Sequence, residues 1–104
     1  MTQKRQEVRY DLLDSETYAI YLNVPGSQIV VLQAFFELYE GVAITRTLSV
    51  KNSLVCLLTV PDMYPDCVAI LNAIHNIVPW RMAEPPDQQT RALYHGYAKK
   101  GKEL

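Results

Sequence analysis

The chain has 104 residues, of which 49% are hydrophobic and 20% are charged, so it is long enough for one domain and too apolar for wholesale disorder. Ten basic residues against eleven acidic ones give a formal net charge of −1, which provides no electrostatic reason to expect binding to nucleic acid or an anionic membrane. The two cysteines, Cys56 and Cys67, form no CxxC pair and have no neighbouring histidine pair. This argues against a zinc site or a disulfide framework. We therefore expect a cytoplasmic protein without a metal or a cofactor.

Residues 1–15 are predicted to form an N-terminal arm. Val8, Tyr10 and Leu12 alternate with polar residues, which fits either a short edge strand or an unfixed arm. The charged residues 1–14 lack the apolar stretch of a secretory signal. Residues 17–36 carry no charge over about the length of a membrane span, but Asn23, Pro25-Gly26 and Gln28 interrupt them. A strand, a turn and a helix explain this segment better.

The first strand is predicted over residues 17–24, because apolar and other side chains alternate there with the period of a half-buried strand. Pro25-Gly26 ends it, and Ser27 is a candidate N-cap for a helix over residues 27–40. Gly41 follows as a C-terminal signal. Few polar residues interrupt this helix, so we expect it to be covered on more than one side. Its expected apolar stripe is Val31, Leu32, Phe35, Leu38 and Tyr39.

Two further strands and a second helix follow. Strands are predicted over residues 42–48 and 54–60, with a turn over 49–53 between them. Residues 54–60 are apolar on both faces, which predicts a central strand. Pro61 ends that strand, and Asp62 can cap a helix over residues 63–78. Residues 80–83 could add a last short strand. The expected apolar stripe of this helix is Cys67, Ile70, Leu71, Ile74, Ile77 and Val78.

The order β-α-β-β-α predicts an α+β fold, most simply a ferredoxin-like plait with an antiparallel sheet and both helices on one face. This domain spans residues 16–83, and residues 84–104 form a basic C-terminal tail that is expected to be a short helix. The opposite sheet face needs a cover, either a second copy of the chain or the tail helix with Leu93. The expected interaction surface comprises Tyr21, Val55, Leu57, Trp80, Tyr94 and Tyr97.

No set of side chains predicts catalysis. His75 lies on the polar side of a helix and His95 in the tail, and neither has a carboxylate or a cysteine at a pairing distance in sequence. Cys56 fits a core position, whereas Cys67 lies near a helix N-terminus, where a reactive thiolate would be stabilised. Aromatic and basic residues are interleaved in the tail, as in some proteins that bind single-stranded nucleic acid. The near-neutral net charge instead favours an amphipathic helix that packs its aromatic residues on the sheet.

The segment from Asn23 to Gln28 is the most suggestive one. A strand, the Pro25-Gly26 turn, an aliphatic helix, Gly41 and a strand with Val42 and Ile44 resemble the ACT-type regulatory domain, whose ligand loop is also a Pro-Gly turn between the first strand and first helix. Residues 32–47, with Tyr39-Glu40-Gly41, also look like an uncharacterised family of small bacterial domains. Backbone N–H groups at a helix start bind anions. The candidate ligand residues are Asn23, Gly26, Ser27, Gln28 and Arg46.

Arg46 permits two interpretations. It is the only charged residue in its strand, where it can protect a sheet edge against aggregation or clamp an anion or carboxylate in a dimer groove. For the whole chain we expect a non-catalytic regulatory or protein-interaction module that forms a homodimer. The alternative is a sensor of a carboxylate metabolite at the Pro-Gly loop.

Overall fold

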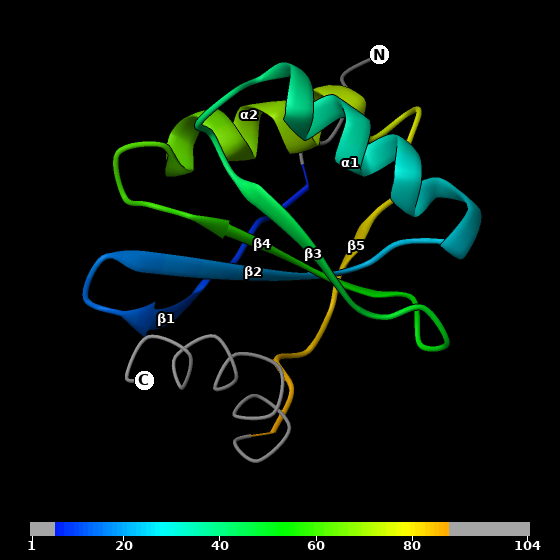
Figure 1. Ribbon diagram of the computed structural model, residues 1–104, viewed down its shortest axis with the longest axis horizontal. Helices are drawn as coiled ribbons and strands as arrows, with labels where there is room; N and C mark the ends of the chain where they lie inside the picture. Colours follow the sequence, from blue (N-terminus) through cyan, green and yellow to red (C-terminus); the bar gives the residue numbers. More distant parts are fainter. Residues whose placement is uncertain (1–5, 88–104) are drawn as a thin grey trace, which may run out of the picture.

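The computed structural model describes residues 6–87, which form an antiparallel sheet with two helices packed on one of its faces (Figure 1). The helices are α1, Ile29–Leu38, and α2, Tyr64–Ile74; a short 3-10 turn, Gly26–Gln28, precedes α1. The α+β class is therefore confirmed. The strands are β1, Asp11–Asp14; β2, Thr17–Asn23; β3, Ile44–Ser49; β4, Leu54–Thr59; and β5, Arg81–Met82.

Strand β4 lies in the middle of the sheet, between β2 and β3, as its two apolar faces predict. Strands β1 and β5 share the other edge of β2. β1 pairs with the first half of β2, and β5 pairs with Leu22 and Asn23 at its end. The last short strand expected over residues 80–83 is thus present. β3 forms the opposite edge of the described sheet.

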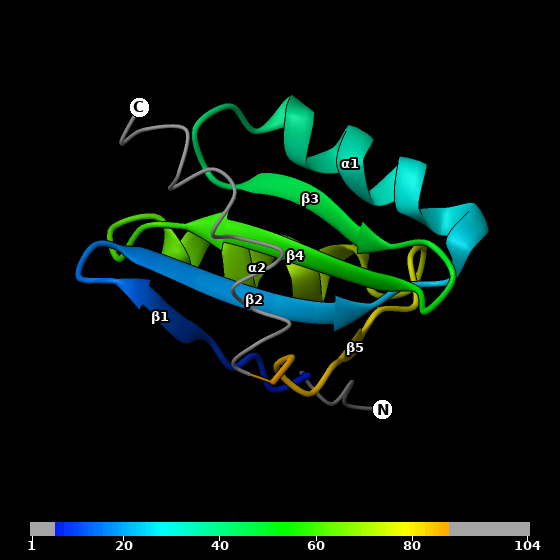
Figure 2. The same cartoon turned by 60° about the horizontal axis from the view of Figure 1, so that its bottom comes forward.

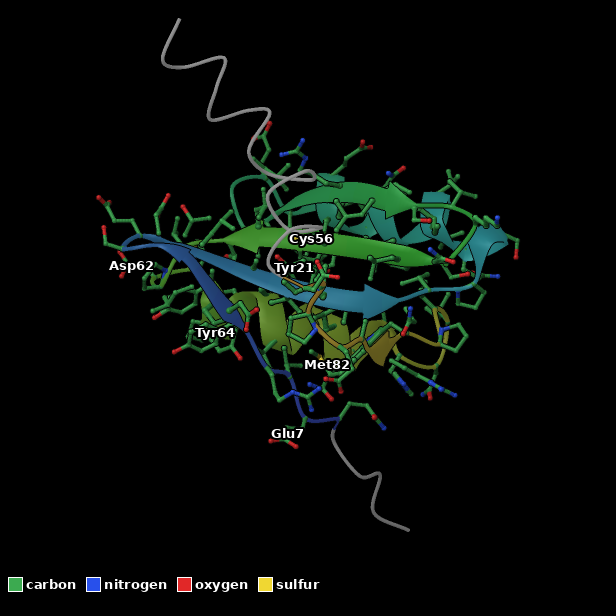
Figure 3. The ribbon with its side chains drawn as sticks, turned by 90° about the horizontal axis from the view of Figure 1, so that it is seen from below. Glu7, Tyr21, Cys56, Asp62, Tyr64 and Met82 are labelled. Atoms are coloured by element: carbon green, nitrogen blue, oxygen red, sulfur yellow. The ribbon has the colours of Figure 1, made fainter. Side chains whose placement is uncertain are left out.

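The main core lies between the sheet and both helices. Ile20 and Leu22 of β2 face the helices, and their partners across the register are Leu57 and Val55 of β4. Val55 and Leu57 are fully buried, so the expectation that they share the outer sheet face with Tyr21 is wrong. The register pairs Tyr21 with Cys56 instead, and these two side chains lie on the face away from the helices (Figure 3).

Neither helix begins as the sequence predicts. Gln28 and Met63 are the N-cap residues of α1 and α2, and neither cap has a side-chain hydrogen bond, so Ser27 and Asp62 are not caps. Backbone turns start both helices: the Gln28 N–H donates to the Pro25 carbonyl at 2.7 Å, and the Met63 N–H donates to the Val60 carbonyl at 2.9 Å. Backbone carbonyls of the preceding turns thus accept these N–H groups in place of a side-chain oxygen.

A tight turn ends α1. The Val42 N–H donates to the Tyr39 carbonyl at 3.2 Å, and Gly41 has φ of +84° at the third position of this turn. A type II turn requires a positive φ there, which glycine adopts without steric cost. Gly41 therefore follows the helix end as predicted, but α1 ends at Leu38 with Tyr39 as its C-cap, two residues before the expected end at residue 40, so Gly41 lies one position beyond C′.

The described part of the N-terminal arm is packed on the domain. Asn72 of α2 accepts a hydrogen bond from the Gln6 N–H at 2.8 Å, and the Tyr64 hydroxyl donates to the Val8 carbonyl at 2.9 Å. The arm then continues into β1. Of the two patterns that the alternation permitted, the edge strand is the one that forms.

Candidate functional site

Helix α1 carries an apolar surface that nothing in the described part of the chain covers. Its buried side is Ile29, Leu32 and Phe36, and of the stripe expected from the sequence Leu32 is buried while Val31 and Phe35 pack at the edge of the core. On the opposite side, Val30 and Leu38 are 69% and 76% exposed, and Ala34 between them is also exposed. We call Val30, Ala34 and Leu38 the α1 outer surface. The three residues are spaced by four, so they form one row along the helix.

Sequence reasoning anticipated that this helix would be covered on more than one side, but it did not identify the residues of the second side. It placed Leu38 and Tyr39 in the core stripe, but they are 76% and 49% exposed. The expectation of a second covered side came from the composition, and Glu37 is indeed the only charged residue among the ten of α1. A helix that is apolar all round is either buried on several sides or awaits a partner. In the described residues the sheet covers only one side.

Acidic side chains gather at one end of the domain. The start of β2, the end of β4 and the start of β3 lie at this end, as the strand registers require (left in Figure 1). An open cleft of about 420 Å³ lies here between α1 and β3, lined by Phe36, Glu37 and Glu40, among others. The connections and the adjoining helix turns at this end carry six exposed carboxylates and no basic residue: Asp14, Glu16, Glu37, Glu40, Asp62 and Asp66.

The other end of the described domain has the opposite character. The β3–β4 turn, the loop after β2 and the segment between α2 and β5 meet there, and they contain no carboxylate. Lys51 lies in the β3–β4 turn, and Arg81 begins β5 opposite Asn23. Acidic residues therefore lie at one end of the strands, and basic residues lie at the other.

The Pro25-Gly26 loop lies at this second end. The N–H groups of Gln28 and Ile29 donate to the carbonyls of Pro25 and Gly26, which leaves only those of Gly26 and Ser27 for an anion. The Asn23 amide nitrogen donates to the Asn52 carbonyl at 3.4 Å. Gly26 has no positive φ, and a Cβ there would meet open space. The loop is thus exposed, and two of its backbone N–H groups are already used by hydrogen bonds within its own turn.

Arg46 is not brought to that loop. It lies in the middle of edge strand β3, opposite Cys56, on the sheet face away from the helices. Its charge slightly favours the Cys56 thiolate, but burial dominates and raises the pKa of that thiol from 9.0 to about 12. The proposed counter-charge and the proposed backbone site are therefore on different parts of the surface.

Cys67 and His75 are held in packing and hydrogen-bond contacts within the domain. Cys67 is fully buried, and burial raises the pKa of its thiol from 9.0 to about 12, so the reactive thiolate considered for it is disfavoured. The His75 Nε2 lies 3.1 Å from the Trp80 carbonyl oxygen, and the two rings meet edge to face at 5.0 Å. Among the described residues, no three His, Cys, Asp or Glu side chains are grouped to hold a metal ion.

The aromatic residues of the expected interaction surface are buried where they are described. Trp80 is fully buried, and its Nε1–H donates to the Leu71 carbonyl at 2.7 Å. Tyr21 is only 2% exposed and packs with Ala19, Cys56 and Ala83. A small cavity of about 130 Å³ lies beside it, between β1 and β5, with Arg9 and Met82 in its wall. Tyr94, Tyr97 and His95 lie outside the described residues.

Three tyrosines stack at the arm. The rings of Tyr10 and Tyr18 lie parallel with centroids 3.9 Å apart, and Tyr64 meets both edge-on. The pKa of Tyr18 is raised, first by a side-chain hydrogen bond with Tyr10 and second by burial. The pKa of Tyr64 is raised mainly by burial. Because the parallel rings are already in contact, the cluster has no gap for a ligand ring. It fastens the arm to α2.

Comparisons with known proteins supply no assignment: no family model, no curated protein and no solved structure matches this chain. No helix in the described region is long and apolar enough to cross a bilayer.

Proposed function

We propose that this chain is a non-catalytic protein-interaction module that binds its partner through the α1 outer surface. The observation that carries the proposal is the exposure of Val30 and Leu38, 69% and 76%, in a helix with one charged residue. Burial of a large aliphatic side chain contributes roughly 1.5–3 kcal/mol. A row of such residues left in water is therefore characteristic of a surface that binds another protein.

We also propose a specific fold within the α+β class. We infer a ferredoxin-like plait of the kind found in ACT-type regulatory domains. Its support is the antiparallel order β5-β2-β4-β3, in which the first and third strands of the β2-α1-β3-β4-α2-β5 unit are central and both helices pack on one face. Fold alone does not specify function, so the regulatory role rests on the exposed helix.

The carboxylate sensor has weaker support. A carboxylate site needs convergent donors, and Arg46 lies on the other sheet face from the helix that the Pro25-Gly26 turn enters. The remaining donors are two exposed backbone N–H groups at the start of a three-residue turn. The α1 outer surface, in contrast, is continuous and unoccupied by any described segment.

Site-specific photocrosslinking in cells that produce the chain tests the interaction role. A photoreactive residue replaces Ala34 in α1, and the matched control replaces the exposed Ala69 on the outer side of α2. We expect one discrete protein adduct from position 34 and none from position 69. Leu38→Glu in the position-34 chain should abolish the adduct, because it places a charge in the same row. Equal labelling from both positions, or none from either, would contradict the proposal.

A further inference from the structure

We propose that the partner of the α1 outer surface is a second copy of this chain, docked antiparallel about a two-fold axis at Ala34. This proposal rests on the proposed function, because it names the occupant of the same surface. In a two-fold contact each residue meets a fixed partner on the other copy. With the axis at Ala34, the two Ala34 side chains meet, and Val30 of each copy meets Leu38 of the other.

The surface is self-complementary in size. Ala34 is the small residue at the centre of the row, and the large Val30 and Leu38 stand at equal separations on either side. A small central residue allows two helices to approach to about 8 Å, the short end of the usual range of interaxial distances. Rows spaced by four pack into each other at a crossing of about 50°, which keeps both large residues in contact.

Charge favours the antiparallel arrangement. The C-terminal end of α1 lies at the acidic end of the domain, and its N-terminal end lies near the end with Lys51 and Arg81. A parallel pair would bring Glu37 and Glu40 of both copies together. The antiparallel pair separates the two acidic ends and places each on the side of its partner's basic residues. At physiological salt the attraction acts over about 8 Å, so it orients the copies more than it binds them.

The contact is small. One helix pair buries less than the roughly 800 Å² per partner of a standard protein interface. We therefore expect a reversible dimer with a dissociation constant of about 10 to 100 μM, rather than a permanent one.

Sedimentation of the purified full-length chain tests the axis. Wild type should shift from 11.9 kDa toward 23.8 kDa as its concentration rises. Ala34→Glu and Ala34→Lys should each weaken association at least about tenfold, because like charges would then meet on the axis. An equimolar mixture of the two variants should recover the dimer. Ala69→Glu, on α2, should dimerise as wild type does.

A second pair of variants tests the direction of the helices. Val30→Glu alone should weaken the dimer, and adding Leu38→Lys to the same chain should restore it, because position 30 faces position 38 only in the antiparallel arrangement. Circular dichroism should be unchanged in all these variants, since the altered positions are exposed. A monomer at every concentration up to about 500 μM, which is at least about fivefold above the expected constant, or a dimer insensitive to Ala34→Glu, would overturn the proposal.

The two proposals can fail separately. An in-cell adduct from position 34 that has the mass of a dimer supports both. An adduct of another mass, together with a monomeric purified chain, would leave the interaction role standing and refute self-association. The absence of any adduct would remove both.

Discussion

Helices α1 and α2 lie on the same face of the sheet (Figure 2). Both bury apolar stripes against it, yet their outer sides differ. The outer side of α2 consists of Asp66, Ala69 and Ala73, and the N-terminal arm is hydrogen-bonded to Asn72 and Tyr64 beside it. The outer side of α1 consists of Val30, Ala34 and Leu38. The N-terminal arm thus borders the outer side of α2, whereas the outer side of α1 leaves a row with two large apolar residues exposed.

The two helices also end differently. α2 ends against Trp80, whose indole N–H satisfies the Leu71 carbonyl from outside the helix. α1 ends in a backbone turn that depends on the positive φ of Gly41. Backbone turns close both helix ends, since the Val78 N–H donates to the Ile74 carbonyl at 2.8 Å, but only α2 also has a side-chain donor at its end. The four predictions below test these differences.

The largest effect is expected in the buried stripes, where the two helices should behave alike. Leu32→Ala in α1 and Leu71→Ala in α2 each remove a fully buried side chain and should each lower the free energy of unfolding by about 2–5 kcal/mol. Val30→Ala, on the α1 outer surface, should change it by less than about 0.5 kcal/mol. Urea titration measures all three at a concentration below dimerisation. A Val30 effect as large as that of Leu32 would show that the outer surface is misassigned.

The end of α2 should depend on the Trp80 side chain. Trp80→Phe removes the donor to the Leu71 carbonyl and leaves a void, so we expect a loss of about 2–3 kcal/mol. His75→Ala is the matched control, because its ring contacts Trp80 but is only half-buried, and it should cost about 1 kcal/mol or less. Thermal or urea unfolding gives both values. Equal losses would mean that ring packing, not the indole hydrogen bond, completes the helix.

Alkaline pH should act on α2 and not on the buried side of α1. α2 buries Cys67, whereas α1 buries no titratable side chain. Because the folded pKa of Cys67 is raised from 9.0 to about 12, the unfolded chain loses this proton first. Stability should therefore be intact below about pH 9 and fall above it, by up to about 1.4 kcal/mol per pH unit for each such thiol.

The matched variant for this pH effect is Cys67→Ala. Cys56 has a similarly raised pKa and stays in the variant, so the slope of unfolding free energy between pH 8.5 and pH 10 (about where the free thiol titrates) should become shallower without vanishing. Urea midpoints at several pH values in that range give the slope. An unchanged slope would show that Cys67 titrates normally in the folded chain.

The smallest effect is expected at the end of α1. Gly41→Ala should cost about 1 kcal/mol, because alanine must adopt a positive φ there. Gly26→Ala is a matched comparison, since a Cβ has open space at both positions and only Gly41 has the positive φ. Gly26→Ala should be neutral or stabilising by a few tenths of a kcal/mol. Differential scanning calorimetry distinguishes the two, and equal effects would contradict the turn assigned to Gly41.

The sequence by itself determined most of the fold. Alternation over residues 17–24 and the two-sided apolar run over 54–60 predicted β2 and the central β4, because strand periodicity and burial are local properties of the pattern. Gly41, Pro25 and Pro61 located turns because these residues restrict or free the backbone wherever they occur. The Pro-Gly loop was also found where expected, although its surroundings were not predictable from local sequence.

Only the tertiary structure decided which apolar residues are inside. The side chains on both faces of β4 are apolar, so alternation alone does not say which face meets the helices. The register does: it pairs Tyr21 with Cys56 on the outer face and leaves Val55 and Leu57 on the face that packs against the helices. In α1 nearly every residue is apolar, so no periodicity could separate Leu32 from Leu38. The orientation of that helix is set by how Ile29, Leu32 and Phe36 fit the sheet. This choice left Val30, Ala34 and Leu38 in water, because one sheet can cover only one side of a helix.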